Sequence, residues 1–441
     1  MDTRWRHMAR LIIGHTTSSS VNIWIRGSER YPFGFVRIRG SKKNQIKKIE
    51  LEKRHGYTGV IRFTGLTEYS EYDVKASFSN KPNTKETEHV EFGHCSGGFR
   101  TFRQKTANSK ISFILGSCNL HTLGYVYNPD TAYERIFAEA KKADADFMMH
   151  CGDQIYFDVP PVSFPTENNY RSKYLDAWGD SRPARKLLTQ LPQYMILDDH
   201  EIVDNFSNDK KILGTFPIDA YKNAGIKVYR EFQYIHSPRN HGNDSLHYSF
   251  SCGKNEFFVM DTRSERYVDR EIIISDDQMS TFKRWIKRNA TKNKFVVTSV
   301  PFVSENKLSD DKWNGFEKQR EEIIEYLFKN KISKVVFLCG DQHSSLYASM
   351  SITDGNREIT INELMSSPIN QIQKTKFSSY HSSHTRKTPS GISYTSSIRK
   401  SDFYNKHSNA MVVTVQGRNV KYKIFRTKKS ETALEEKQFT L

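Results

Sequence analysis

Residues 146–158 constrain the fold more than any other part of the chain. The apolar residues 147–149 predict a short buried strand that breaks at Gly152, and the loop after it carries Asp153 and Tyr156. Carboxylate oxygen binds hard cations such as Fe, Mn, Mg and Ca, and a phenolate favours a ferric ion over zinc. The alternative for this segment alone is a structural turn, in which glycine permits the bend and aspartate caps the next helix.

Three further apolar segments end in side chains of similar chemistry. They predict strands at residues 111–115, 193–197 and 335–338. The side chains that follow these strands are Cys118, Asp198, Asp199, His200, Asp341 and His343. A helical pattern at residues 131–145 predicts a βαβ unit with parallel strands, and parallel strands end at one edge of a sheet. We therefore expect the side chains to converge, as two cations that share a bridging carboxylate require.

The pattern along the chain changes at about residue 106. Residues 1–105 contain short alternating stretches between turn residues and predict a small antiparallel Ig- or fibronectin-like β-sandwich. Residues 106–441 combine apolar strands with helical patterns at 131–145, 276–290 and 316–329. They predict a mixed, layered α/β domain with polar loops gathered at the strand ends.

The chain is strongly basic, with a formal net charge of +17 and a pI near 9.4. Such a charge attracts polyanions or anionic substrates and does not determine the fold. Part of it lies in residues 371–401, which are rich in Ser, Thr, Lys and Arg and poor in apolar residues. We expect an insertion with no core of its own, either a solvated loop or a basic flap over the site.

Six motifs occur in an order that resembles one known family. They are Gly-Ser-Cys (116–118), Gly-Asp-Gln-Ile-Tyr (152–156), Asp-Asp-His-Glu (198–201), Asp-Thr-Arg (261–263), Gly-Asp-Gln-His (340–343) and Ser-Ser-Pro (366–368). In combination, over about residues 10–425, they resemble the alkaline phosphatase D, or PhoD-like, branch of the metallophosphatases. The resemblance implies a four-layer αββα core after the β-sandwich. It also implies a centre with Fe(III) and Ca(II), for which Mn, Mg and Zn are alternatives.

The resemblance implies a set of metal ligands. They are Cys118, Asp153, Tyr156, Asp199, Asp341 and His343. Asp153 would bridge the metals and so take part in catalysis, and Cys118 and Tyr156 would bind the iron. Asp199 would contact the second cation.

The resemblance also implies residues that face the substrate phosphate, His200 and Arg263. The chemistry of these two agrees with this, because an imidazole can protonate a leaving alkoxide and a guanidinium can hold phosphate oxygens in a bidentate fork. Asn119 stands where many members have other small or aromatic residues, and we expect it to bind substrate and alter the pocket. We expect Glu201 to orient His200 or a backbone amide rather than to bind metal.

The first hypothesis is a metal-dependent phosphoesterase that hydrolyses phosphodiesters, phosphomonoesters or both through a metal-activated water or hydroxide. A nuclease or phospholipase would use the same centre, so nucleic acid is a candidate substrate beside small phosphate esters. The alternative from another class is a basic polyanion-binding protein with an inactive metal site. No apolar run reaches the length of a membrane span and no secretory leader is apparent. This predicts a cytoplasmic protein, or a periplasmic or secreted one if a leader precedes the chain.

Overall fold

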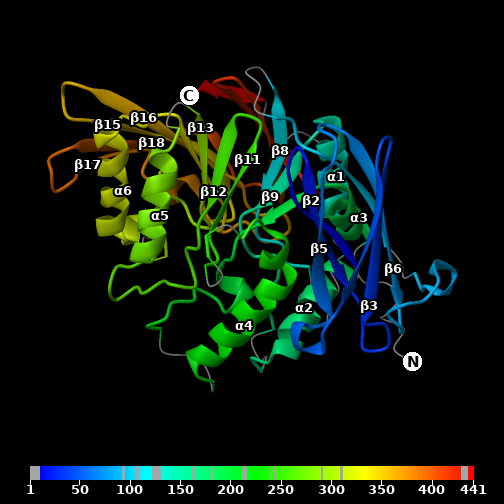
Figure 1. Ribbon diagram of the computed structural model, residues 1–441. Coiled ribbons are helices and arrows are strands. Elements are labelled where there is room, and N and C mark those ends of the chain that lie inside the picture. Colours follow the sequence, from blue (N-terminus) through cyan, green and yellow to red (C-terminus); the bar gives the residue numbers. More distant parts are fainter. Residues whose placement is uncertain are drawn as a thin grey trace.

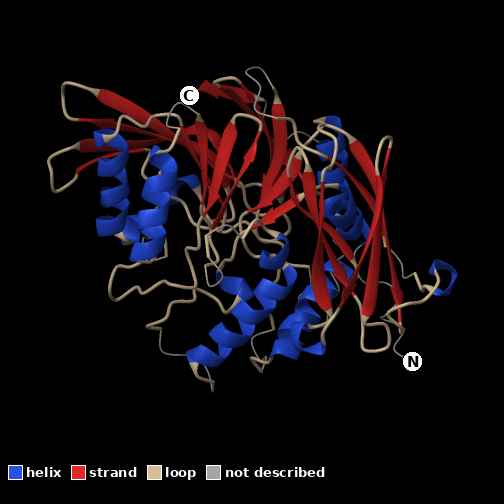
Figure 2. Cartoon of the chain, viewed as in Figure 1, coloured by secondary structure: helices blue, strands red, loops and turns tan. Residues whose placement is uncertain are grey.

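The computed structural model has two large β-sheets and two smaller ones, with helices on the outside (Figures 1 and 2). It describes residues 10–91, 95–104, 109–121, 131–160, 164–179, 182–210, 216–239, 241–242, 245–289, 292–307, 311–428 and 436–441. No helix in this described part is long and apolar enough to cross a membrane. The mixed α/β class that the sequence predicts is confirmed.

The first large sheet has six strands. In spatial order they are β10 (Gln193–Met195), β9 (Phe147–His150), β8 (Ile111–Gly116), β19 (Asn409–Gln416), β20 (Asn419–Arg426) and β21 (Lys437–Thr440). Strands β8, β9 and β10 run parallel, with Phe113 paired to Phe147 and Met148 paired to Gln193. The loops after these three strands therefore leave from one edge of the sheet.

The second large sheet has eight strands. In spatial order they are β11 (Tyr248–Cys252), β12 (Asn255–Val259), β13 (Asn293–Val297), β14 (Val335–Cys339), β16 (Glu358–Met365), β15 (Ser345–Thr353), β18 (Ser393–Tyr404) and β17 (Ser383–Lys387). Strands β12, β13, β14 and β16 are parallel, and the remaining strands pair antiparallel with their neighbours.

The main hydrophobic core lies between these two sheets. Successive side chains of a strand point to opposite faces, so Phe113 of β8 enters this core while Ile114 packs on the outer face. In the other sheet, Phe257 of β12 enters the core and Phe258 packs on the outer side. The rings of Phe113 and Phe257 meet edge to face with centroids 5.7 Å apart. Each buried phenylalanine contributes roughly 1.5–3 kcal/mol, which holds the two sheets together.

Helices cover the outer face of each large sheet. The helices are α1 (Ala132–Lys142), α2 (Glu167–Gly179), α3 (Arg182–Gln190), α4 (Ile218–Phe232), α5 (Asp276–Lys287) and α6 (Glu317–Lys329). Helices α1 and α3 pack on the six-stranded sheet, where Tyr133 and Ile136 of α1 contact the cluster around Ile114. Helices α5 and α6 pack on the eight-stranded sheet, where Trp285 and Leu327 lie in one cluster with Phe258, Val296 and Phe337. Helices α2, α3 and α4 lie outside the segments predicted to be helical.

The N-terminal strands form the two smaller, antiparallel sheets. One contains β1 (Leu11–Thr16), β2 (Ser20–Arg26) and β5 (Thr58–Thr64), and the other contains β4 (Asn44–Glu50), β3 (Phe33–Gly40), β6 (Glu71–Ser79) and β7 (Ser96–Arg100). The two sheets share a core that includes Ile23, Val36 and Phe78. Trp24 faces the other way, packs against Trp178 and donates a hydrogen bond to the Glu231 carbonyl at 2.8 Å. This contact joins the N-terminal strands to α2 and α4.

The expectation that the basic segment 371–401 forms a loop is wrong for its second half, which contains two strands. Strands β17 and β18 extend the eight-stranded sheet at the β15 edge. Tyr394 and Ile398 alternate with more exposed residues and are buried in the cluster under α6. The charged side chains point outward, as in the ion pair of Arg386 with Glu317. In a strand added at the edge of a sheet, only every second side chain is buried, so the strand needs few apolar residues. The low apolar content of this segment therefore predicted a loop where a strand forms.

Candidate active site

Four of the predicted metal ligands come shortly after the end of a strand, and the backbone of each lies in the left-handed region. The φ angles are 60° at Cys118, 59° at Asp153, 66° at Asp341 and 49° at His343. Few residues other than glycine adopt such angles, and they occur mainly where the surrounding structure holds the chain in place. Cys118 follows β8, Asp153 follows β9, and the other two follow β14. The turns let these short loops bend back at the edges of the two facing sheets.

Asp153 lies next to two other predicted ligands. The Tyr156 hydroxyl donates to Asp153 Oδ2 at 3.2 Å. Cys118 is joined to the same loop through its own amide, which donates to the Gly152 carbonyl. Burial raises the pKa of the Cys118 thiol well above its usual value, and the charges of Asp153 and Asp341 raise it further. A cation beside the sulfur would reverse this effect and favour the thiolate.

Ser367 connects the loops of the two sheets. Its hydroxyl lies 3.2 Å from Cys118 Sγ and accepts the His343 backbone N–H at 3.2 Å. Ser367 belongs to the Ser-Ser-Pro motif that follows β16. It thereby helps to bring Cys118 of the six-stranded sheet close to His343 of the eight-stranded sheet.

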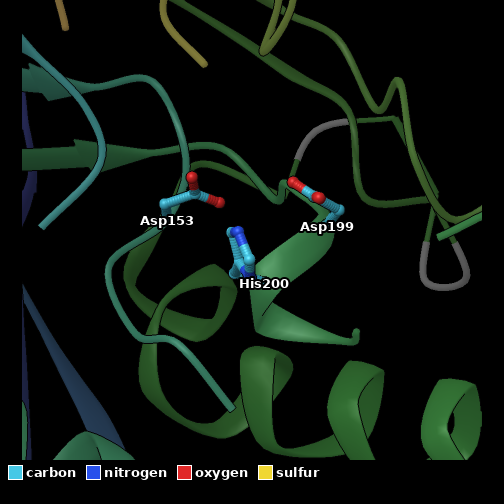
Figure 3. Close-up of side chains that lie close together, drawn as sticks. All are labelled: Asp153, Asp199 and His200. Atoms are coloured by element: carbon cyan, nitrogen blue, oxygen red, sulfur yellow. The ribbon is translucent and has the colours of Figure 1, made fainter. Parts of the chain in front are cut away.

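Carboxylates form the centre of the site. Ligand atoms of Asp153, Asp199 and His200 all lie within 4.8 Å of one another, and so do those of Asp198, Asp199 and Asp341. Asp199 and His200 come from the short 3-10 helix η4 (Asp199–Glu201), which follows β10. In Figure 3 the His200 ring lies between the carboxylates of Asp153 and Asp199. Asp199 is thus common to both groups, and the two groups offer two candidate positions for a cation.

Three carboxylates of this cluster, Asp153, Asp198 and Asp341, have raised pKa values, whereas the pKa of Asp199 is lowered because Arg263 and His200 outweigh its burial. Burial raises the pKa of Asp341 to about 6, with a further contribution from Asp311 and Asp199. Burial likewise raises the pKa of Asp198 to about 7, although Arg263 acts in the opposite direction. Buried like charges are costly unless a counter-charge lies between them. A metal ion would supply that counter-charge.

Several donor atoms in the site are available to a metal. Asp153 Oδ1, Asp199 Oδ1 and His343 Nδ1 are buried, and none has a hydrogen-bond partner among the described residues. Asp199 Oδ1 lies 3.6 Å from Arg263 Nη2. Buried polar atoms are rarely left unpaired, so these three atoms fit a ligand role. The donor set of carboxylates, imidazole, thiol and phenol therefore suits metal binding.

Glu201 holds the loops that carry the carboxylates. Its side chain accepts the backbone N–H groups of Asp153 at 3.1 Å, Gln154 at 2.6 Å and Asp198 at 3.0 Å. It also accepts from Gln233 Nε2 at 3.2 Å. Glu201 therefore orients backbone amides, which was one of the two roles expected for it.

Replacement of Glu201 is expected to destabilise the protein. Glu201→Ala leaves three buried N–H groups without their acceptor, and we expect a loss of about 3 kcal/mol or more in the free energy of unfolding. Urea denaturation of the metal-free protein measures this loss. Glu201→Gln, which keeps one acceptor oxygen, is the control and should lose less. Equal stability of Glu201→Ala and the wild type would contradict the role.

A cavity of about 490 Å³ opens onto the carboxylates. The residues that line it are Asp153, Asp199, His200, Asp204, Asn205, Ser207, Asp209, Lys210, Val268, Asp269, Asp311, Lys312, Asp341, Gln342, His343, Lys374 and Thr375. Five of the predicted site residues belong to this lining. Cys118 and Tyr156 do not belong to the described lining, although both lie close to Asp153.

His200 is held by a residue that the sequence did not single out. Its Nδ1 lies 2.7 Å and 3.0 Å from the two carboxylate oxygens of Asp158. Burial alone would lower the pKa of His200, but the charges of Asp199, Asp153 and Asp158 outweigh burial and raise the pKa well above its usual value. Asp158 closes the motif segment 146–158, so its carboxylate was a visible signal.

Arg263 and Asn119 do not belong to the described cavity lining, although each contacts a residue that does. Arg263 is fully buried, and its guanidinium donates to Asp198 at 2.5 Å and, as a fork, to both oxygens of Asp311 at 2.6 and 3.0 Å. Asn119 is also buried, and its backbone N–H donates to the Asp153 carbonyl at 2.9 Å. Phosphate contact by Arg263 and substrate binding by Asn119 stay predictions. Sequence reasoning missed Asp311, because no strand or glycine motif marks its loop.

Comparisons with known proteins agree with the motif order. A family model described as PhoD-like phosphatase matches residues 113–424. Alkaline phosphatase D of Bacillus subtilis (strain 168) is 23% identical over 287 residues, which are 55% of this chain and 47% of that protein. The chain thus matches about half the length of this relative. The solved structure of PhoD has a TM-score of 0.73 at 17% identity, covering 100% of this chain and 90% of that one, which shows the fold.

Proposed function

Because the chain belongs to the PhoD-like phosphatase family, we propose that it is a metal-dependent phosphoesterase acting on phosphodiesters, phosphomonoesters or both. The observation that carries this proposal is the group of buried carboxylates that lines the cavity. Asp153 and Asp199 each keep an oxygen atom with no hydrogen-bond partner in the described part of the chain. Such atoms are suited to bind cations that in turn bind phosphate.

The donor chemistry supports two kinds of metal. The Tyr156 phenolate favours a ferric ion over zinc, and iron also accepts thiolate, so Cys118, Tyr156 and Asp153 would hold Fe(III). Carboxylate oxygens favour calcium, so we assign Ca(II) to Asp199 and Asp341, with Mn, Mg or Zn as alternatives. His343 would complete the set. When bound, such metals supply Lewis acidity that stabilises phosphate charge and favours ionisation of water.

Side chains of the protein would hold the site in place and protonate the leaving group. Asp158 holds His200 through Nδ1, which leaves Nε2 to donate a proton to the leaving oxygen of the ester. The Asp158 carboxylate also favours the protonated imidazole that a general acid needs, because its charge and hydrogen bond act to raise the pKa of His200. Glu201 keeps the Asp153 loop in place during the reaction.

The same family membership supports a finer description of the fold. We propose that the two facing sheets with their outer helices form the four-layer αββα core of the catalytic domain, residues 106–441. The N-terminal strands, within residues 1–105, would form a separate β-sandwich. The catalytic centre would then lie entirely within the larger domain.

Turnover of model esters tests the proposed function. We expect the purified protein to hydrolyse bis-p-nitrophenyl phosphate, p-nitrophenyl phosphate or both, because the carboxylate cluster would bind the metals that this chemistry uses. Release of p-nitrophenolate is followed before and after treatment with a chelator, and again after iron and calcium are added back. We expect the chelator to abolish turnover and the added metals to restore it. No turnover with any supplied metal would end the proposal. Nucleotides and lipids in the same assay test the nuclease and phospholipase alternatives.

The role of Asp158 as a positioning residue can be tested through the leaving group. Asp158→Asn removes the charge that favours the protonated imidazole of His200, and we expect kcat to fall on the order of 10-fold for phenyl phosphate. The fall should be smaller for p-nitrophenyl phosphate, whose leaving group needs little protonation. Asp219→Asn is the control, because Asp219 is an exposed carboxylate in α4 outside the described cavity lining, and it should leave kcat unchanged for both esters. Equal losses for both esters would contradict the role.

A further inference from the structure

Two lysines line the cavity next to the carboxylate cluster. Lys312 comes from the loop before α6 and is only 8% exposed, whereas Lys374 comes from the segment after β16 and is exposed. Neither ammonium group has a hydrogen-bond or ion-pair partner among the described residues. Most of the Lys312 side chain is buried, but its ammonium group contacts the solvent of the cavity and can bind an anion that enters it. No assigned role in the proposed reaction uses either lysine.

The positions of the two lysines differ in depth. Lys312 is mostly buried and follows Asp311, which also lines the cavity and binds Arg263. Lys374 is exposed, and its neighbour Thr375 lines the cavity with it. Lys312 is therefore the deeper of the two, near the predicted metal ligands, and Lys374 lies at the exposed part of the cavity.

The other cationic groups of the site are already engaged. The Arg263 guanidinium forms ion pairs with Asp198 and Asp311, as described above. Lys210 also lines the cavity, but its ammonium donates to the carbonyls of Asp204 and Asn205 at 3.1 and 3.0 Å. Lys312 and Lys374 are thus the two lysines of the described lining whose ammonium groups have no protein acceptor.

We infer that Lys312 and Lys374 bind the anionic substrate, Lys312 through oxygens of the reacting phosphate and Lys374 through a second negative charge on the leaving alcohol. The inference rests on the proposed function and narrows its substrates to phosphate esters whose alcohol is itself anionic. Another part of the lining is acidic, with Asp204, Asp209 and Asp269. Because that part repels anions, the second charge is directed toward Lys374.

Inorganic phosphate tests the role of Lys312. We expect Lys312→Met to raise both the KM for p-nitrophenyl phosphate and the inhibition constant of inorganic phosphate on the order of 10-fold, because one charge-assisted hydrogen bond is lost. Lys312→Arg should restore most of the binding. The alternative is that Lys312 only offsets the charges of Asp311 and Asp341. In that case, elemental analysis would show altered metal content while phosphate inhibition stays unchanged, which would overturn the inference.

A pair of matched esters tests the role of Lys374. We expect the wild type to have a KM about 3-fold lower for 4-carboxyphenyl phosphate than for phenyl phosphate, a modest effect because Lys374 is exposed. Lys374→Met should remove this difference, and added salt should reduce it in the wild type. Lys376→Met is the control, since Lys376 is equally exposed in the same segment and lies outside the described cavity lining. A KM ratio unchanged in Lys374→Met would overturn the inference.

Failure of this inference can be separated from failure of the proposed function. If the wild type hydrolyses p-nitrophenyl phosphate and the lysine variants have the same KM and the same inhibition by phosphate, only the anion-binding role is refuted. If the wild type hydrolyses nothing, calorimetric titration of the metal-loaded protein with inorganic phosphate still tests Lys312. Binding that weakens in Lys312→Met would support the role, and binding that does not change, or that is absent in the wild type, would refute it.

Discussion

Asp153→Asn is expected to lose both metal and turnover while the fold remains intact. Asp153 provides a buried oxygen without a partner among the described residues and lies close to Asp199, His200 and Tyr156. Removal of a residue that only hydrogen-bonds to a metal ligand typically lowers metal affinity or activity roughly 10–100-fold. Removal of a ligand shared by two metals should lower both by more. Asparagine is preferable to alanine, because it has the same size and tolerates the φ of 59° at this position.

Elemental analysis and p-nitrophenyl phosphate turnover measure the effect of Asp153→Asn. In the metal-free protein the thermal midpoint should stay equal or rise. Burial raises the pKa of Asp153 well above its usual value and neighbouring carboxylates raise it further, with only His200 opposing, so removal of this charge relieves repulsion. Asp277→Asn is the control, since Asp277 is an exposed carboxylate in α5. Full activity or full metal content in Asp153→Asn would contradict the bridging assignment.

Arg263→Met is expected to destabilise the protein by about 3–5 kcal/mol, because it leaves buried carboxylates without their counter-charge. Asp198 is fully buried against the Arg263 guanidinium, and Asp311 receives both of its terminal nitrogens. The pKa of Arg263 lies well above its usual value because these carboxylates, with Asp199, outweigh the opposing effect of burial. Urea denaturation measures the loss in the free energy of unfolding.

The control for this substitution is Arg284→Met, which removes an exposed arginine from α5. It should change the free energy of unfolding by less than about 0.5 kcal/mol. If Arg263→Met is as stable as the wild type but binds inorganic phosphate more weakly, the guanidinium faces the substrate as the family resemblance implies. In that case the ion pairs with Asp198 and Asp311 are not its main role.

Strand-end motifs allowed much of the candidate site to be predicted from the sequence. The glycine-containing turns after β9 and β14 lie where apolar runs stop, and the side chains that follow, Asp153, Asp341 and His343, line one cavity. Local pattern sufficed here because a buried parallel strand places its carboxyl end, and hence the next few residues, at a sheet edge. Helix α2 shows an unused signal, since Tyr170, Tyr174 and Trp178 recur at four-residue spacing.

Composition was a poor guide where burial depends on a neighbour. Residues 371–401 were predicted to be a polar insertion, yet β18 pairs along β15 and buries Tyr394 and Ile398. A strand that covers an existing sheet edge needs few apolar residues, because the neighbouring strand and α6 supply most of the buried surface. Such pairing joins segments about 50 residues apart and leaves no local trace.

By itself, the sequence determined the α/β class, the ends of the parallel strands and the chemical identity of the side chains that follow them. Only the tertiary structure decided how those side chains are paired. It paired Asp158 with His200 and Asp311 with Arg263, and it brought the Glu201 carboxylate within hydrogen-bond distance of the Asp153 amide. The physical reason is that a strand and its end depend on neighbouring residues in the chain, whereas the partner of a buried charge depends on which distant loop the packing brings within hydrogen-bond distance.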